Sequence, residues 1–393
     1  MECMKAYGGN NVINMVLKKY HTAKPNDFKG SGTTSGYKYS YNVLNKPIAT
    51  LKPASVSNIE IRMGRVHIAL IPVSGQGPSL DKDLAMKASG KIGISSGILS
   101  VISIKAEIEN PNLIEAILQG VINSQVIPKI QDTLKKVPLP QLQNLFGTGL
   151  SAQVRTGSVI TGPAFEIGAR IAGKAGIAAA DKPASSDLTT LNNGSDNNAS
   201  IIGVVSAGAV NYLIGKLIPP LSKNFNERGS KIGFGAGVKG TIKASTPVLK
   251  ISAGNCTAYT TVSITLKAGI KVPIKGWTWV KIPVPNVKTG ITNTLNTQGN
   301  KGVVTLTGVN SIKVSFSWPS VLKPVESIVK SLLNGVLSLF KGTISKAVKG
   351  KKFEIFQLPT KIPGTNLSTS VSFLSNGLSY YKSSIKAIVR LQG

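Results

Sequence analysis

The chain has 393 residues, of which 41% are hydrophobic and only 16% charged, so it holds enough apolar material for folded cores and is not generally disordered. This length predicts two domains of about 200 residues each. The net charge of +30 predicts attraction to anionic partners such as phospholipid, lipopolysaccharide, nucleic acid or sulfated sugar. The alternative is a soluble protein that merely tolerates its charge.

The first half of the chain carries strand patterns followed by a helix. Apolar residues fall on odd positions from Ile59 to Met63 and on even positions from Val66 to Leu70, a phase slip typical of a β-bulge at Gly64. Residues Pro111–Leu134 predict a long helix, followed by a Leu-Pro step and a strand that closes the half at Phe165–Ile171. The apolar stripe expected on this helix is Leu113, Ile117, Val121 and Ile130.

Residues 181–200, DKPASSDLTTLNNGSDNNAS, have almost no large apolar side chains and predict a flexible linker. The expected domains are therefore residues 1–180 and 201–393. Residues 1–200 hold 21 basic against 13 acidic residues, whereas residues 201–393 hold 25 basic residues against Glu227, Glu326 and Glu354. The second domain is thus expected to be strongly cationic.

The second half repeats the order of the first. Apolar residues alternate with polar ones along residues 261–272, as in an antiparallel sheet wrapped around a core. Residues Val325–Val348 predict a second long helix, followed by another Leu-Pro step and closing strands over Leu378–Val389. The shared order indicates an internal duplication. The apolar stripe expected on the second helix is Ile328, Leu332, Leu333, Val336, Leu337, Phe340 and Ile344.

The segment KVPIKGWTWVKIPVPNVK, residues 271–288, combines indoles and lysines at strand spacing. In an extended chain, Trp277, Trp279 and Lys281 share one face with Lys271 and Lys275, opposite Val280 and Ile282. One interpretation is an outer face for a lipid boundary, where indoles lie at the interface and ammonium groups meet phosphate. The other is that the tryptophans pack inward and the aliphatic side chains face a second sheet.

Residues suited to catalysis are scarce. The chain has two histidines, and His67 lies on the strand face opposite Val66 and Ile68, so we expect it to face solvent. The close carboxylates Asp81 and Asp83 lie in a polar context, where nothing separates their pKa values. No GxSxG, HExxH or Walker motif is present, and Cys3 and Cys256 have no metal-site spacing, although they can pair. We therefore expect a protein that is not an enzyme and needs no cofactor or metal.

The glycines of GFGAGVKG, residues 233–240, resemble a phosphate loop only superficially. A dinucleotide site needs a helix after the glycines, whereas β-like residues follow here. The expectation is close backbone packing in a bent strand.

Several segments resemble the bactericidal/permeability-increasing and lipopolysaccharide-binding proteins. Ala244–Leu266 resembles the strand pair that opens the second barrel of that family, and Asn123–Pro140 resembles its first long helix with the helix exit. Tyr37–Tyr41 and Ser200–Ile218 resemble further segments in the same order. The resemblance implies an α+β fold of two elongated antiparallel β-barrels, each with a long packed helix, joined by a central sheet in a boomerang-shaped, tubular lipid-binding molecule. Ile127 stands where the family has a disulfide cysteine.

The resemblance also implies a function, namely non-enzymatic binding or transfer of lipids or lipopolysaccharide-like amphiphiles. Apolar pockets under the two helix stripes would hold acyl chains in an N-terminal and a C-terminal lipid-binding barrel, and cationic surfaces would dock on anionic membranes. The headgroup-binding tip of the family's first domain maps onto Lys29, Lys38, Lys82 and Lys87. Specific nucleic-acid binding is not expected, because base readout favours arginine and the basic residues here are mostly lysine.

The family implies secretion and a part in innate immunity. The start of the chain carries no secretory signal, so we expect a secreted protein without its leader, with a cytoplasmic protein as the alternative. Two other functions stay open: a surface-active or matrix protein that uses the fold without cargo, and a polyanion binder that acts by charge alone.

Overall fold

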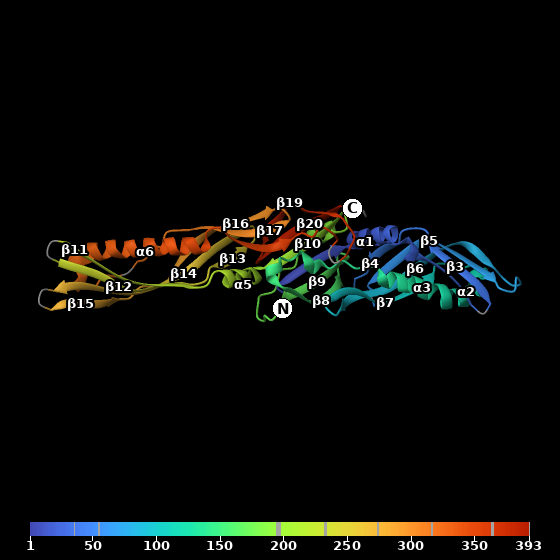
Figure 1. The fold of residues 1–393 in the computed structure, drawn as a ribbon, viewed down its shortest axis with the longest axis horizontal. Coiled ribbons are helices and arrows are strands. Elements are labelled where there is room, and N and C mark those ends of the chain that lie inside the picture. The colour runs from blue at the N-terminus through green and yellow to red at the C-terminus, as the bar shows by residue number, and fades with distance from the viewer. Residues whose placement is uncertain are drawn as a thin grey trace.

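The chain folds into an elongated molecule whose two halves lie end to end (Figure 1). The structure is a computed structural model and describes residues 1–34, 36–53, 56–193, 198–231, 234–272, 275–315, 317–362 and 365–392. Within these residues, the strands form three antiparallel sheets, one in each half and one between them. The predicted α+β fold, two elongated curled sheets with packed helices joined by a central sheet, is confirmed.

The N-terminal sheet has the order β2-β3-β5-β6-β7, with β4 paired to β5. The pairing of β5 with β6 shifts register between Met63 and Val66, which confirms the predicted bulge. On either side of the bulge the alternating apolar residues of β5 are buried: Ile59, Ile61, Met63, Val66, Ile68 and Leu70. The strands are β2 (Lys29–Thr33), β3 (Tyr37–Val43), β4 (Ile48–Leu51), β5 (Ile59–Pro72), β6 (Leu80–Ser95) and β7 (Ile98–Ile108).

A continuous helical run packs against this sheet: α2 (Leu113–Val121), a π-helical turn (Ile122–Val126) and α3 (Ile127–Lys136). Its buried side chains recur at intervals of three and four residues, as on one face of an amphipathic helix. They are Glu115, Leu118, Ile122, Val126, Ile127, Ile130, Thr133 and Leu134.

The predicted stripe is wrong at its N-terminal end, because it started from Leu113, whereas the buried face of α2 carries Glu115 and Leu118. The side chains of Leu113 and Ile117 are 79% and 62% exposed, and Val121 is half-buried. Only Ile130 of the four predicted residues is fully buried.

The central sheet has the order β19-β20-β10-β1-β9-β8 and joins the halves through the β1–β10 pair. A helix follows each of these two strands, α1 (Asn10–Ala23) after β1 and α5 (Ala207–Leu217) after β10. The arrangement is nearly symmetric, as expected for an internal duplication. The strands are β1 (Met4–Gly9), β8 (Ala152–Ile160), β9 (Ala164–Ile171), β10 (Asn198–Ser206), β19 (Ser370–Tyr381) and β20 (Ser384–Gln392).

Residues 181–200 differ from the flexible linker that their composition predicts. They contain α4 (Ser185–Thr190) and the start of β10, while residues 194–197 lie outside the described part. Leu188 and Leu191 are buried, and Asp181 accepts hydrogen bonds from the Ser383 and Ser384 hydroxyls at 2.8 and 2.7 Å. Lys386 also pairs with Asp187, so buried leucines and paired carboxylates together hold the segment against the central sheet.

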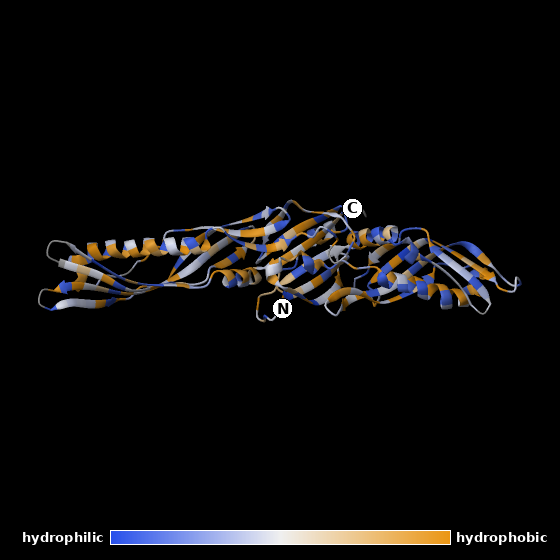
Figure 2. Cartoon of the chain, in the orientation of Figure 1, coloured by the Kyte–Doolittle hydropathy of each residue, from blue (hydrophilic) through white to orange (hydrophobic). Residues whose placement is uncertain are grey.

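The C-terminal sheet has the order β11-β12-β14-β16-β17-β18, with β13 and β15 paired to β14. The long helix α6 (Glu326–Val348) lies along it and buries Val329, Leu333, Val336, Phe340 and Ile344. Apolar and polar residues alternate along the strands, so each has a core face and an outer face (Figure 2). The strands are β11 (Leu221–Lys231), β12 (Phe234–Ala244), β13 (Val248–Ser252), β14 (Asn255–Val272), β15 (Gly276–Ile282), β16 (Val287–Gln298), β17 (Lys301–Val309) and β18 (Lys351–Gln357).

Short 3-10 helices complete the fold at Pro25–Phe28, Leu142–Leu145, Thr148–Leu150 and Ser320–Val325. Among the described residues, no helix combines the length and the apolar character needed to cross a bilayer.

Candidate functional site: the cationic outer face of the C-terminal sheet

Three lysines stand side by side on the outer face of the C-terminal sheet. Lys239 of β12 is the cross-strand partner of Lys267 of β14, and Lys267 is in turn the partner of Lys281 of β15. Neighbouring strands are about 4.8 Å apart, and like charges directly opposite one another destabilise a sheet. This lysine row (Lys239, Lys267 and Lys281) therefore carries a cost that stability alone does not explain.

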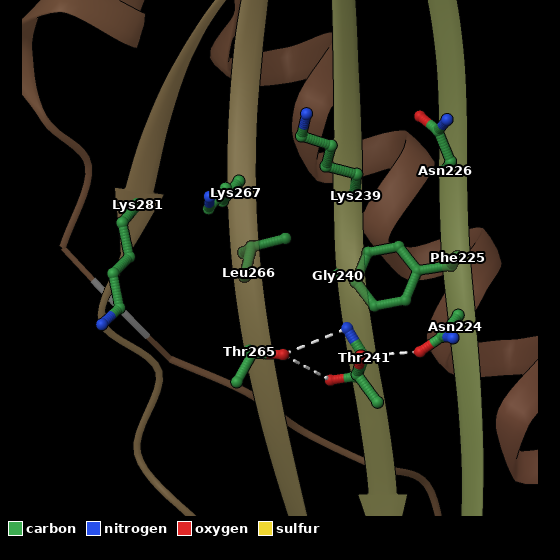
Figure 3. Close-up of a pocket in the computed structure, with 10 residues that line it drawn as sticks. All are labelled: Asn224, Phe225, Asn226, Lys239, Gly240, Thr241, Thr265, Leu266, Lys267 and Lys281. Atoms are coloured by element: carbon green, nitrogen blue, oxygen red, sulfur yellow. Dashed lines mark hydrogen bonds between the residues drawn. The ribbon is translucent and has the colours of Figure 1, made fainter.

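The lysine row borders an open depression of about 470 Å³ (Figure 3). Its floor combines the apolar Phe225 and Leu266 with a polar rim, where the Thr241 hydroxyl donates to the Asn224 side-chain oxygen at 2.7 Å. The volume lies within the roughly 300–1,000 Å³ of small-molecule sites. A shallow hollow with ammonium groups at its edge suits an anionic group that stays partly in solvent.

Two tryptophans extend the site beside the row. Trp277 and Trp279 of β15 share the face of Lys281 and stack on each other, with ring centroids 5.3 Å apart. They reach back across the sheet over glycines: a Cβ atom at Gly237 would lie 3.1 Å from each indole, and one at Gly269 would lie 2.8 Å from Trp279. The tryptophans thus lie on the outer face, as the first interpretation expected, but they pack along the sheet.

Cations cover the indoles. The Arg228 guanidinium lies 5.1 Å from the Trp277 ring centroid, and the Lys239 ammonium lies 4.1 Å from that of Trp279. Cation–π contacts contribute about 0.5–1 kcal/mol each at exposed sites. The indoles form a layer between the glycines and the cations, and they hold Arg228 and Lys239 over the outer face of the sheet.

The other residues predicted for this face lie at its margin. Lys271 is exposed and pairs across the strands with Trp277, and Lys275 is exposed just before β15. The glycines at 235, 237 and 240 lie in β12, where the first two face the indoles and the third packs closely against the Thr265 carbonyl. This agrees with the close packing expected for GFGAGVKG, whose Gly233 lies outside the described residues.

The lysines predicted at the first-domain tip are in different surroundings. Lys29 of β2 and Lys38 of β3 are exposed, and Lys87 pairs with Glu107 at 3.1 Å. Lys82 has the parity of the buried Leu80 and Leu84 in β6, but its side chain is 40% exposed and forms an ion pair with Glu115 of α2. The headgroup contact of these four lysines stays a prediction.

The space under α3 is closely packed. Phe28, Tyr41, Met63, Ile130 and other side chains line it and leave no room for a water molecule between them. Along α6, Val336 and Phe340 are buried in the core, while Ile328 and Leu332 are half-buried where the helix faces Gly229 of β11.

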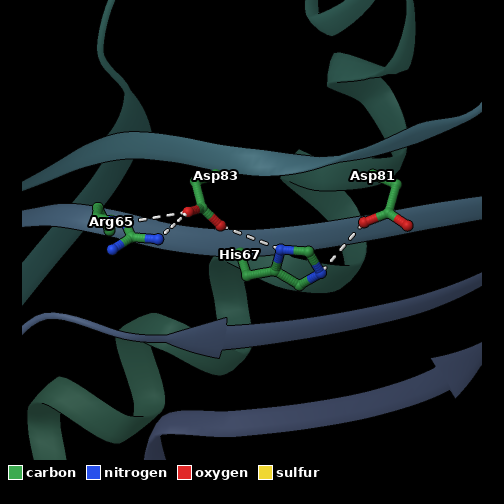
Figure 4. Close-up of polar contacts among 4 residues, drawn as sticks. All are labelled: Arg65, His67, Asp81 and Asp83. Atoms are coloured by element: carbon green, nitrogen blue, oxygen red, sulfur yellow. Dashed lines mark hydrogen bonds and ion pairs between the residues drawn. The ribbon is translucent and has the colours of Figure 1, made fainter.

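His67 lies in a surface charge network on the outer side of the N-terminal sheet (Figure 4). Its Nδ1 is 3.1 Å from Asp83 Oδ1 and its Nε2 is 3.2 Å from Asp81 Oδ1, while Arg65 also pairs with Asp83. Hydrogen bonds from Arg65, and then from His67, lower the pKa of Asp83. The exposed position agrees with the solvent-facing role expected for His67.

Both cysteines are free thiols. Cys3 is buried, and burial raises the pKa of Cys256 to about 11, against a smaller opposing effect of a hydrogen bond with Tyr380. Neither is therefore activated as a thiolate near neutral pH.

The fold as a whole defines the class of protein, an elongated molecule of two curled β-sheets with packed helices. P47 of Clostridium botulinum E1 is a solved structure of this kind, with a TM-score of 0.50 and 9% sequence identity over 100% of this chain and 98% of that one. At this identity, the likeness shows a shared fold alone.

Two further structures also match. Lipopolysaccharide binding protein has a TM-score of 0.45 at 12% identity, covering 100% of this chain and 99% of that one. P47 from Clostridium botulinum A2 has a TM-score of 0.43 at 11% identity, covering 100% and 97%. No protein-family model and no curated protein sequence matches the chain.

The sequence reasoning found Lys281 and the tryptophans but missed Lys239, Lys267 and Arg228. All six of the residues that carry the site have outward parity in their strands, which was a usable signal. The register that brings these residues together across four strands could not be predicted, because no local pattern fixes which residues stand opposite one another.

Proposed function

We propose that this protein is a non-enzymatic binder of anionic amphiphiles, acidic phospholipids or lipopolysaccharide-like molecules, and that it docks on their headgroups with the outer face of its C-terminal sheet. The observation that carries the proposal is the lysine row, three ammonium groups placed on adjacent strands. A ligand that carries several anionic groups relieves the electrostatic repulsion between the three lysines. Binding therefore removes the unfavourable free energy that this repulsion adds to the free protein.

The charge of the chain favours an extended anionic surface as the ligand over a single small molecule. Each basic residue near an anionic bilayer contributes about 1 kcal/mol, so the lysine row and Arg228 together contribute about 4 kcal/mol. Compact ammonium groups suit this diffuse attraction, whereas sequence-specific nucleic-acid readout favours the arginine fork.

The packing under α3 favours headgroup docking over carriage of a whole lipid in the N-terminal half. The space there has no room for a water molecule and so none for an acyl chain, and α6 buries Val329, Leu333, Val336 and Phe340. The proposal therefore places the ligand at the sheet surface. A secreted protein remains the proposed setting, since anionic headgroups are accessible to it there.

The test is sedimentation of the full chain with vesicles of phosphatidylcholine, with and without phosphatidylglycerol. The variant K239Q/K267Q/K281Q should bind the anionic vesicles about 100-fold more weakly, since it loses about 3 kcal/mol. The control K216Q/K250Q/K349Q changes the net charge equally at exposed positions, and Lys250 stands opposite the uncharged Thr257. The control should lose much less affinity.

Equal losses in the two variants would contradict docking at the row and would leave net charge as the explanation. Equal affinity of the wild-type protein for heparin, duplex DNA and the vesicles would favour the polyanion alternative. Co-purified lipid seen by native mass spectrometry would restore the carrier hypothesis.

A further inference from the structure

The helix α2 is turned with apolar side chains toward solvent. Leu113, Ile114 and Ile117 are 79%, 49% and 62% exposed, whereas Glu115 on the buried side is 3% exposed. An ordinary surface helix places its carboxylates outside and its apolar stripe inside. The exposed α2 face (Leu113, Ile114 and Ile117) is thus an inversion of the usual amphipathic pattern.

Polar contacts hold the helix in this orientation. Glu115 accepts a hydrogen bond from the Asn112 backbone N–H at 2.6 Å, and its own N–H donates to the Asn112 side chain at 2.9 Å. Lys82 of β6 completes an ion pair with the same carboxylate. A buried carboxylate needs such partners. The two capping contacts lie within the first turn of α2, so the Lys82 pair is the one of the three that rotating α2 to hide its apolar face would break.

The exposed α2 face is small, and this decides what can cover it. Three side chains form a patch of at most a few hundred Å², whereas a stable protein interface needs about 800 Å² on each partner. Shallow insertion into a bilayer needs only a few apolar side chains on a helix beside basic residues. Lys129 and Lys136 are exposed on α3, which continues the same run.

The exposed α2 face and the lysine row lie toward opposite ends of the molecule. In Figure 1, α2 lies near one end, while β11, β12 and β15 form the other. A flat lipid surface in contact with one end of an elongated molecule leaves the other end free.

We propose that the exposed α2 face inserts into the interfacial region of an anionic bilayer, and that one molecule thereby bridges two lipid surfaces, one at α2 and one at the lysine row. The proposal rests on the proposed function for the second contact. It adds a second site and a consequence, the clustering of anionic vesicles.

The experiment measures binding and clustering separately on phosphatidylglycerol-containing vesicles, by sedimentation and by light scattering. The variant L113S/I114S/I117S should keep its affinity at the row within about threefold and should lose clustering by about tenfold or more. The matched control L217S/V321S/L339S replaces side chains that are 52%, 50% and 61% exposed elsewhere. The control should bind and cluster like the wild type.

Three outcomes would overturn the bridging proposal: wild-type protein that binds without clustering, an α2 variant that clusters normally, or a control that loses clustering equally. A wild-type dimer without lipid that the α2 variant converts to a monomer would instead assign the face to self-association. Wild-type protein that fails to bind at all would remove the proposed function first. If the triple variant does not fold, the single change Leu113→Ser at an exposed position gives the same readout without adding charge.

Discussion

Replacing the central lysine of the row tests whether the site is held at a cost to stability. In Lys267→Gln, the repulsion with Lys239 and Lys281 disappears, and Lys267 makes no ion pair among the described residues. Each neighbour at about 7 Å costs about 0.6 kcal/mol in water, and salt at 0.1 M halves this. The variant should gain about 0.6 kcal/mol in its free energy of unfolding.

The same substitution should weaken vesicle binding about fivefold, because one basic residue contributes about 1 kcal/mol. Urea unfolding at low salt and at 1 M salt measures the stability, and the gain should vanish at high salt, where the Debye length is about 3 Å. Lys250→Gln, opposite Thr257, is the control and should gain nothing. A variant that is less stable, or equally stable at both salt concentrations, would refute the repulsion argument.

Five other substitutions test the packing. Leu118→Ala should destabilise the fold by about 2–5 kcal/mol and Leu113→Ala by less than about 0.5 kcal/mol in urea unfolding; equal losses would contradict the assigned face of α2. Burial alone would raise the pKa of Glu115, but hydrogen bonds from Lys82 and the Asn112 backbone lower it overall. Its stabilisation is therefore complete above the ordinary carboxyl pKa and is lost as the pH falls through the folded value. Glu115→Gln should cost about 1–3 kcal/mol at pH 7, and stability curves of the two proteins should converge below about pH 4. Gly269→Ala should displace the indole and cost about 1–3 kcal/mol, with a change in tryptophan fluorescence, whereas Gly342→Ala, open in α6, should stabilise by up to about 1 kcal/mol.

The predicted linker shows how composition can mislead. Residues 181–200 are polar enough to suggest disorder, yet Leu188 and Leu191 are buried and Asp181 is bonded to serines about 200 positions away. Partners that distant are invisible in a local window, so composition correctly located the connection and misjudged its packing.

Alternation along the chain was sufficient for the bulge in β5 and for placing Trp277, Trp279 and Lys281 on one face of a strand, and composition was sufficient for the cationic second half. Which face of that strand points outward was decided by the packing of the sheet. Which side of α2 is buried depended on its packing against β6, where Glu115 pairs with Lys82. The lysine row likewise exists only through the register of β12, β14 and β15. Strand register is set by long-range packing of the buried faces, so the tertiary structure alone decided which charges stand together.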